Sequence, residues 1–260
     1  MAKITVSLAQ IRIAHGDIGR NVTNGERMII EAARRGSHLV VLPELWTTGY
    51  ALERANELSS AVNAGPFAQI GKLARENKIC VTGSMLEKRG LEVTNSAAFF
   101  APTGQPLGIY LMIHLFMLFN EHIHLTAGSA PLLLELPWGR TGIAICYDLR
   151  FPELFRNYAV EGAKMVIIPA EWPLERAEHW RALLIARAIE NQMYIVACNA
   201  AGETGGTVFG GGSMIVDPWG KVIVAGGDEP GMFTAEIDLD RVDAVREKIP
   251  VLDDRRPDLY

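Results

Sequence analysis

The sequence predicts a layered α/β protein, and three observations lead to that fold class. Short apolar runs that are typical of strands alternate with amphipathic segments that are typical of helices. No linker rich in Pro, Gly or Ser and no internal repeat of about 20–50 residues interrupts this alternation. The chain has 260 residues, of which 49% are hydrophobic and 21% charged, enough to build a well-packed core. We therefore expect residues 1–260 to form a single domain.

Short apolar runs mark the expected strands. The run HLVVLPE is nearly continuous, as in a strand that is covered on both faces. In chain order, we expect strands over residues 4–13, 38–44, 79–87, 93–101, 105–112, 141–148, 164–170, 193–200 and 212–218. Residues 220–225 and 232–238 are expected to pair with each other as a closing hairpin.

Four segments have the apolar spacing of helices that bury one face. They cover residues 22–35, 66–77, 153–162 and 175–191. At the first helix, Asn21 or Thr23 can cap the N-terminus, and Gly36 follows the last turn. The stretch GETGGTVFGGG at residues 202–212 lacks the spacing of a phosphate-binding loop, so we expect a flexible loop that lines a pocket.

Composition excludes several functional classes. The 25 Lys and Arg residues are outnumbered by 30 Asp and Glu residues, which argues against a protein that binds nucleic acid through its phosphates. Cys80, Cys146 and Cys198 are far apart, so neither a disulfide framework nor a CxxC metal site is expected. The N-terminus lacks the apolar core of a signal peptide, and the apolar stretch at 109–119 is about half the roughly 20 residues of a membrane span. We therefore expect a cytoplasmic protein that does not bind membranes.

Two residues follow predicted strands at positions where α/β proteins place functional groups. Cys146 ends an apolar strand, and the turn into the next helix has backbone N–H groups that favour a thiolate and can hold an oxyanion. Glu44 ends the run LVVLPE, where burial raises the pKa of a carboxyl group towards that of a general base. Simpler explanations exist for both, since such a Cys is usually only buried and such a Glu can cap a turn or pair with Arg.

Five segments together resemble the nitrilase superfamily of carbon–nitrogen hydrolases. In chain order they are VVLPELWTTGY, HLFMLFNEHIHLTAG, GIAICYDLRFPELFR, PAEWP and HWRALLIARAIENQ, and the resemblance runs from residue 4 to about residue 258. The EWP before HW, the LLIARAIENQ segment and the C-terminal REKIP and DLY are most similar to the omega-amidase branch. The resemblance implies a four-layer α-β-β-α sandwich that assembles as a homodimer or a larger homo-oligomer.

The resemblance also implies a Glu–Lys–Cys triad that uses no metal or organic cofactor. On this sequence the general base maps to Glu44 and the nucleophile to Cys146, while the backbone N–H of Tyr147 contributes to the oxyanion hole. A second family glutamate, which positions the substrate and the Lys, maps to Glu121. The residues expected to bind the substrate are Trp172, Phe116 and His122.

One position departs from the family pattern. The family Lys lies two residues before HLF, as in YRKIHLF, but the segment here reads YLMIHLF, so Met112 occupies the Lys position. None of the seven Lys residues of the chain falls in a matching place. Removing a cation from a site of developing negative charge typically costs on the order of 100- to 1,000-fold in rate. We also expect one of Glu44 and Glu121 to become protonated and the pKa of the Cys146 thiol to rise.

Several functions remain open from the sequence. The first is an amidase that cleaves a small amide, such as an omega-amide, through a Cys146 thioester with release of ammonia, its activity impaired by Met112. The second is a catalytically inactive protein of the same fold that holds a ligand or a partner. A natural relative with a changed function and a deliberately altered sequence would both show this pattern. A metal hydrolase is the third, because Glu121, His122 and His124 cluster, but the HExxH spacing is absent and no further ligand is in view.

Overall fold

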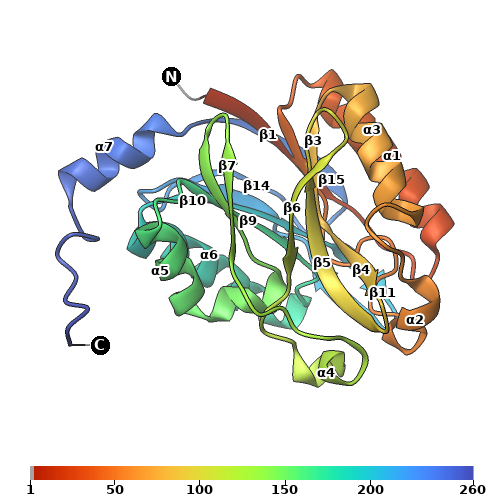
Figure 1. Cartoon of the computed structure of the whole chain (residues 1–260). Coiled ribbons are helices and arrows are strands. Elements are labelled where there is room, and N and C mark those ends of the chain that lie inside the picture. The colour runs from red at the N-terminus through yellow and green to blue at the C-terminus, as the bar shows by residue number, and fades with distance from the viewer. Residues whose placement is uncertain (1–2, 260) are drawn as a thin grey trace.

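The structure, a computed structural model, describes residues 3–259, which form two β-sheets stacked face to face with helices outside them (Figure 1). The first sheet has seven strands in the order β15-β1-β2-β3-β5-β4, with β6 paired to β5. Its strands are β1 (Lys3–Gln10), β2 (Leu39–Val41), β3 (Cys80–Thr82), β4 (Ser84–Arg89), β5 (Glu92–Phe100), β6 (Pro106–Leu111) and β15 (Gly231–Asp238).

The second sheet has six strands in the order β14-β13-β10-β9-β8-β7. Its strands are β7 (Leu132–Leu136), β8 (Gly139–Ile143), β9 (Met165–Ala170), β10 (Tyr194–Asn199), β13 (Met214–Val216) and β14 (Val222–Ala225). A separate antiparallel pair consists of β11 (Ala201–Thr204) and β12 (Thr207–Gly210).

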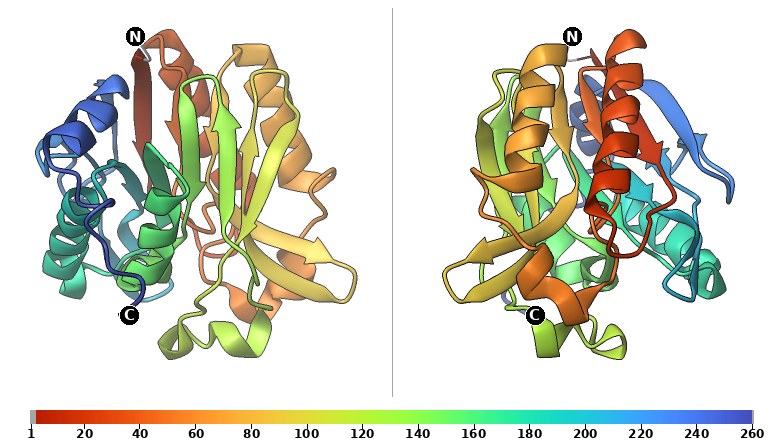
Figure 2. Two further views of the ribbon diagram at one scale, coloured as in Figure 1. Left: turned by 60° about the vertical axis from the view of Figure 1, so that its left-hand side comes forward. Right: turned by 90° about the vertical axis from the view of Figure 1, so that its right-hand side faces the viewer.

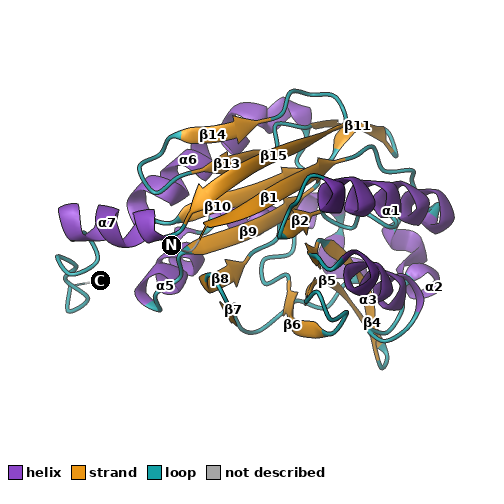
Figure 3. Cartoon of the chain, turned by 90° about the horizontal axis from the view of Figure 1, so that it is seen from above, coloured by secondary structure: helices purple, strands orange, loops and turns teal. Residues whose placement is uncertain are grey.

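Helices cover the outer face of each sheet, as Figure 2 and Figure 3 show. On the first sheet these are α1 (Ile18–Arg34) and α3 (Gly65–Asn77), and on the second they are α5 (Pro152–Val160) and α6 (Ala177–Asn191). Shorter helices are α2 (Ala55–Leu58), α4 (Glu121–His124) and α7 (Asp240–Lys248), the last of which extends away from the sheets. This arrangement confirms the predicted four-layer α-β-β-α sandwich. Across the described residues, no helix combines the length and the apolar character that crossing a membrane requires.

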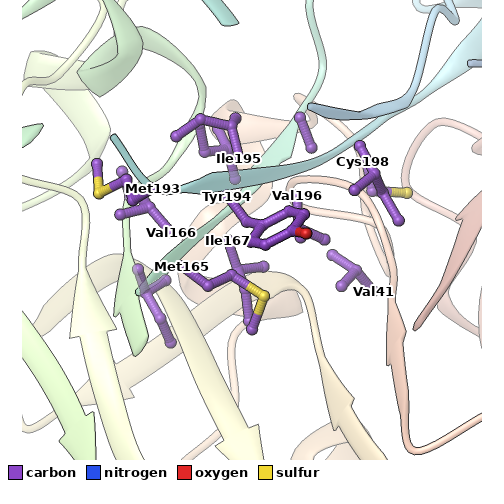
Figure 4. Packing of buried hydrophobic residues seen from close by; sticks show 14 of the residues in the cluster. Val41, Met165, Val166, Ile167, Met193, Tyr194, Ile195, Val196 and Cys198 are labelled. Carbon is purple, nitrogen blue, oxygen red and sulfur yellow. The ribbon is translucent and has the colours of Figure 1, made fainter. Parts of the chain in front are cut away.

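The core lies between the two sheets. Figure 4 shows Val41 of the first sheet near Ile167 and Tyr194 of the second, and all three belong to one buried apolar cluster. Every residue of β9 and β10 is buried, because helices cover one face of these parallel strands and the other sheet covers the second face. The continuous apolar runs seen in the sequence therefore correspond to strands in the middle of the sandwich.

The start of α1 differs from the prediction. The helix begins at Ile18, and its N-cap is Asp17, whose carboxylate accepts a hydrogen bond from the Arg20 N–H at 3.0 Å. The two expected caps, Asn21 and Thr23, both lie inside the helix. The Asn21 amide instead binds backbone groups of two neighbouring loops, which a helical pattern cannot reveal.

The predicted closing hairpin is wrong. β14 pairs with β13 in the second sheet, whereas β15 pairs along its whole length with β1 in the first. Two strands that are neighbours in sequence thus belong to different sheets. The glycine-rich stretch 202–212 also forms more regular structure than expected, since it contains the β11–β12 pair.

Helix α1 packs very closely on Trp46, which follows the loop after β2. A Cβ atom on Gly25 would overlap the buried Trp46 ring. We expect Gly25→Ala to lower the free energy of unfolding by about 1–3 kcal/mol, because an added methyl group must displace the ring. Urea unfolding measures this change.

Gly19→Ala is the matched control, because Gly19 lies in the same helix, is exposed, and has no non-neighbouring atom closer than 3.8 Å to an added Cβ. This substitution should leave the stability unchanged or raise it by up to about 1 kcal/mol, since Ala favours a helix more than Gly does. Equal effects of the two substitutions would contradict the prediction.

Candidate active site

The stacking of the sheets brings the predicted base and the predicted nucleophile together. Glu44 follows β2, Cys146 follows β8 and Glu171 follows β9, all at the carboxyl ends of parallel strands. The Glu44 carboxylate accepts a hydrogen bond from the Glu171 backbone N–H at 2.9 Å and another from the Cys146 thiol. These contacts join the ends of strands from two different sheets.

The backbone is strained at each of the three predicted catalytic side chains. Leu45, Asn120 and Cys146 have a left-handed backbone conformation, with φ of 38°, 59° and 42°. Every other left-handed residue of the described chain is either a glycine or the C-cap of an α-helix. Leu45 follows Glu44, and Asn120 precedes Glu121. A residue in this conformation costs about 1–3 kcal/mol and persists only where its surroundings hold it, which is common at active sites.

Asp148, which sequence analysis did not single out, holds the turn at Cys146. Its buried carboxylate accepts hydrogen bonds from the Ile145 N–H at 2.9 Å, the Tyr110 hydroxyl at 2.7 Å and the His114 N–H at 3.0 Å. These bonds tie the turn after β8 to the segment that follows β6. A charged residue two positions after the Cys, among apolar neighbours, was the available sequence signal.

Glu44 has the protonation behaviour of a general base near neutral pH. Its carboxylate is fully buried, and burial raises its pKa to about 7, although hydrogen bonds from Cys146, the Glu171 N–H and Asn95 lower it. The Asn95 side-chain amide lies 2.8 Å from Glu44 Oε1. A base with a pKa near the working pH exchanges a proton most effectively.

Glu121 is a second buried carboxyl group of the site. Its Oε2 accepts a hydrogen bond from the Phe116 N–H at 2.5 Å. Burial raises its pKa to about 8, and the negative charge of Glu44 acts in the same direction. The Tyr50 hydroxyl is hydrogen-bonded to both carboxyl groups. The charge of Glu44 thus favours the protonated form of Glu121, as expected from the sequence.

Met112, which the sequence resemblance assigns to the Lys position, is buried beside Asn95. Its backbone N–H donates to the Asn95 carbonyl at 3.0 Å, and its Sδ accepts a hydrogen bond from the Asn95 side-chain amide at 3.3 Å. The same amide binds Glu44, so the buried Met112 thioether reaches the partner of the predicted base. No Lys or Arg within residues 3–259 forms an ion pair with Glu44, Glu121 or Glu171.

The Cys146 thiol is not activated in this resting arrangement. Burial raises its pKa well above the ordinary value, and the charges of Glu44 and Glu121 raise it further. The thiol therefore favours its protonated form in this structure. Cys80 and Cys198 lie buried in β3 and β10, where burial raises the pKa of both thiols, and neither lines a pocket found among the described residues.

Cys146 opens into a pocket with aromatic walls. The pocket is lined by Phe116 and Trp172, as expected, and by three further aromatic residues, Tyr50, Phe119 and Tyr147. His122 is exposed on α4 and is not among the residues that line the pocket of Cys146, so its expected contact with substrate stays a prediction. Residues 121–124, where Glu121, His122 and His124 cluster, form the short helix α4. Within residues 3–259, no three His, Cys, Asp or Glu side chains are arranged to hold a metal ion.

The profile of the carbon–nitrogen hydrolase family matches residues 5–247. The chain belongs to this family. It is 42% identical over 259 residues to a 2-oxoglutaramate amidase of Bacillus subtilis (strain 168), with 99% of this chain and 100% of the relative covered. It is 33% identical to a chloroplastic omega-amidase of Arabidopsis thaliana, over 100% of this chain and 74% of the relative.

A solved structure has the same fold. It is a CN-hydrolase superfamily protein of Xanthomonas campestris with an arsenic adduct in its active site, and it superimposes with a TM-score of 0.93 at 29% identity over 98% of both chains. These similarities place the protein among the amidases of the nitrilase superfamily, where it most resembles the omega-amidases.

Two arginines at the pocket of this carbon–nitrogen hydrolase were missed from the sequence. Arg150 lies 4.7 Å from the centre of the Trp172 ring, and Arg176 lies 5.3 Å from that of Phe116. Both line the same pocket as Cys146. Aromatic faces stabilise guanidinium groups in this position, so the pocket carries positive charge near its walls and carboxyl groups near its base. Arg150 lies within the GIAICYDLRFPELFR segment and Arg176 lies three residues after PAEWP, so their closeness to quoted segments was the available sequence signal.

The raised pKa of Glu121 makes stability depend on pH. The folded protein retains a proton on Glu121 up to about pH 8, whereas the unfolded chain loses it near its ordinary pKa of 4.5. The contribution of this group to the free energy of unfolding therefore falls as pH rises through that window. We expect Glu121→Gln to show a shallower loss of stability between about pH 5 and pH 8, measured by urea unfolding at fixed ionic strength.

Glu203→Gln is the control for this measurement, because Glu203 is exposed on β11 and its removal changes the net charge equally. Its pH dependence should match that of the unaltered protein. If Glu121→Gln and Glu203→Gln gave the same slope, the buried carboxyl group would not be responsible for the effect.

Proposed function

We propose that this amidase hydrolyses a small omega-amide of the 2-oxoglutaramate type through a thioester on Cys146. The observation that carries the proposal is the hydrogen bond between the Cys146 thiol and the buried Glu44 carboxylate at the base of a pocket with two arginines. The similarity to a 2-oxoglutaramate amidase and to an omega-amidase supports the substrate class.

Glu44 serves as base and then as acid in each half of the reaction. It accepts the thiol proton as the Cys146 sulfur attacks the amide carbon, and the Tyr147 N–H binds the oxyanion. The C–N bond breaks as Glu44 returns the proton to the departing nitrogen, which leaves ammonia and a thioester. Glu44 then takes a proton from water, whose oxygen attacks the thioester, and the acid leaves as the thiol is re-formed.

Arg150 and Arg176 anchor the far end of the substrate. An omega-amide of a dicarboxylic acid carries a carboxylate away from the reacting amide, and a guanidinium group binds carboxylates through paired hydrogen bonds. Both side chains line the pocket into which Cys146 opens, along with the predicted residues Phe116 and Trp172. These arginines supply the cation that the sequence alone did not identify.

Turnover is impaired because no side chain supplies a cation at the reacting centre. Met112 contributes a neutral thioether to the Asn95–Glu44 pair. Loss of one charged group that stabilises the developing oxyanion reduces rates on the order of 100- to 1,000-fold. The intact Glu44 and Cys146 arrangement favours slow amide hydrolysis over a purely ligand-binding role.

We further propose that the chain acts as a single domain in the cytoplasm and assembles as a homodimer or a larger homo-oligomer. Its three cysteines are free, which fits a reducing compartment. Val160 at the end of α5 and Ile189 on α6 are both about half exposed on the outer helical layer of the second sheet. Analytical ultracentrifugation tests the assembly, and a monomer at micromolar concentration would contradict it.

Incubation with 2-oxoglutaramate tests the function. We expect slow release of ammonia, together with an acyl adduct on Cys146 that mass spectrometry of the acid-quenched protein detects. Cys146→Ala should remove the adduct and the ammonia. Absence of both from the unaltered protein would favour the inactive ligand-binding alternative, and turnover at a rate typical of the family would contradict the proposed impairment.

The substrate class is tested with Arg150→Gln. This variant should raise KM for the carboxylate-bearing amide by about tenfold or more, because a hydrogen bond to a charged group typically contributes about 1.5–3 kcal/mol. An uncharged amide of similar length is the control, and its KM should stay within about twofold. A parallel change in both values would contradict an anchoring role.

Met112→Lys tests the cause of the impairment. The added ammonium group lies where charge develops, so thioester formation should become at least about tenfold faster, as single-turnover mass spectrometry measures. Met117→Lys is the matched control, because the same charge is then added at a side chain that is 65% exposed. If Met112→Lys gave no increase, alone or with Leu111→Arg, the segment would differ from the family by more than the missing charge.

A further inference from the structure

Several acceptor atoms around Glu44 and Cys146 lack a hydrogen-bond donor. Both carboxylate oxygens of Glu171, Oε1 of Glu121 and Oδ1 of Asn95 are buried without a partner among the described residues. A buried acceptor without a donor typically costs about 1–3 kcal/mol, so each such group requires an explanation. The shortage of donors is greatest at Glu171, the one side chain within residues 3–259 with two orphaned carboxylate oxygens.

The missing donors are not supplied by a protein cation. Glu44, Glu121 and Glu171 are at most 1% exposed, and none forms an ion pair with a Lys or Arg of the described chain. Arg150 and Arg176 lie against aromatic rings elsewhere in the pocket. Glu171 lacks hydrogen bonds to its carboxylate, and burial and the two neighbouring glutamates raise its pKa well above the ordinary value. Without a counter-ion these carboxyl groups favour their protonated forms, and a cation bound among them would favour their ionised forms instead.

A small cavity lies beside these acceptors. It is part of the pocket into which Cys146 opens, whose walls include Tyr50, Glu171 and the two arginines, and its volume of about 20 Å³ admits one molecule of the size of water. An ammonium ion has that size, carries a positive charge and offers four N–H donors. A metal ion fits less well, because the described residues contain no cluster of His, Cys, Asp and Glu with the arrangement of a metal site.

We propose that the cluster of Glu44, Glu121 and Glu171, here named the carboxylate cluster, binds an ammonium ion where Glu171 borders the Cys146 pocket. The bound ion donates hydrogen bonds to the orphaned oxygens and pairs with carboxyl groups that form no ion pair with a described Lys or Arg. Ammonia is also the nitrogen product of amide hydrolysis and becomes ammonium by taking a proton from water, so the reaction generates its own activator. Activation rests on the proposed function, whereas binding of the ion does not.

Thermal unfolding of the whole chain tests binding. Ammonium chloride, potassium chloride and tetramethylammonium chloride are compared at equal ionic strength and pH, because the last two lack N–H donors. We expect a saturable rise of Tm with ammonium alone, since a ligand that binds the folded state stabilises it. Equal rises with all three salts, or with potassium and ammonium, would overturn the ammonium site.

Two variants show where the ion binds. Glu171→Gln should lose the ammonium-dependent rise of Tm, while Glu203→Gln, which removes an exposed carboxylate, should keep it. Met112→Lys keeps all three carboxyl groups and should lose the response, because its own ammonium group competes for them. This second variant decides the question if Glu171→Gln does not fold. A full response in Glu171→Gln or Met112→Lys would overturn the proposal.

Single-turnover kinetics test activation. A small ester is the substrate, because its leaving group is an alcohol and ammonium cannot reverse the first step. Saturating ammonium should accelerate formation of acyl-Cys146 by about tenfold in the unaltered protein and by less than about twofold in Met112→Lys. A Tm response without any acyl-enzyme would contradict the proposed function and leave the ammonium site standing. Normal acylation without a Tm response would overturn the ammonium site alone.

Discussion

The Glu44 carboxylate is the group on which the site depends, because both sheets contact it. Asn95 of the first sheet donates to one oxygen, and the Glu171 N–H at the end of β9 donates to the other. Cys146 adds a third hydrogen bond from the end of β8. Burying a carboxylate is costly unless donors surround it, and the donors to Glu44 come from both sheets, so these bonds favour the observed stacking of the sheets. The relative position of nucleophile and base follows from the same bonds.

The local strain at the site is held by neighbouring polar groups. The Ser84 hydroxyl accepts a hydrogen bond from the N–H of the left-handed Leu45 at 2.9 Å, and Asp148 holds the turn that contains the left-handed Cys146. Both partners are buried, so their bonds do not compete with water. Such over-determined turns keep a thiol and a carboxylate in contact before any substrate arrives, which reduces the reorganisation needed for proton transfer.

Electrostatics and packing act in opposite directions at the reacting centre. Burial keeps the thiol and the carboxyl groups largely neutral, which suits folding because ionised groups without partners are costly in the interior. Amide hydrolysis needs a thiolate and an oxyanion, and both are favoured by a nearby cation. Met112 satisfies the packing requirement as a neutral, buried side chain beside Asn95, but it contributes no positive charge.

The layered fold was predictable because burial on both faces leaves continuous apolar runs, as in β9 and β10. Strand pairing was less predictable, because β1 and β15 come from opposite ends of the chain and no local pattern encodes their pairing. The prediction of the helix cap failed for a similar reason, because the Asn21 side chain binds the backbone of a loop that is distant in sequence.

The sequence by itself determined the family, the positions of Glu44 and Cys146 at strand ends, and the absence of a Lys at Met112. These features belong to local motifs, which can be identified without knowing how distant segments pack together. Only the tertiary structure decided that Glu171 joins the carboxyl groups and that Arg150 enters the pocket. Their positions depend on which side chains from distant strands come together in the folded chain, and hydrophobic periodicity carries no information about such contacts.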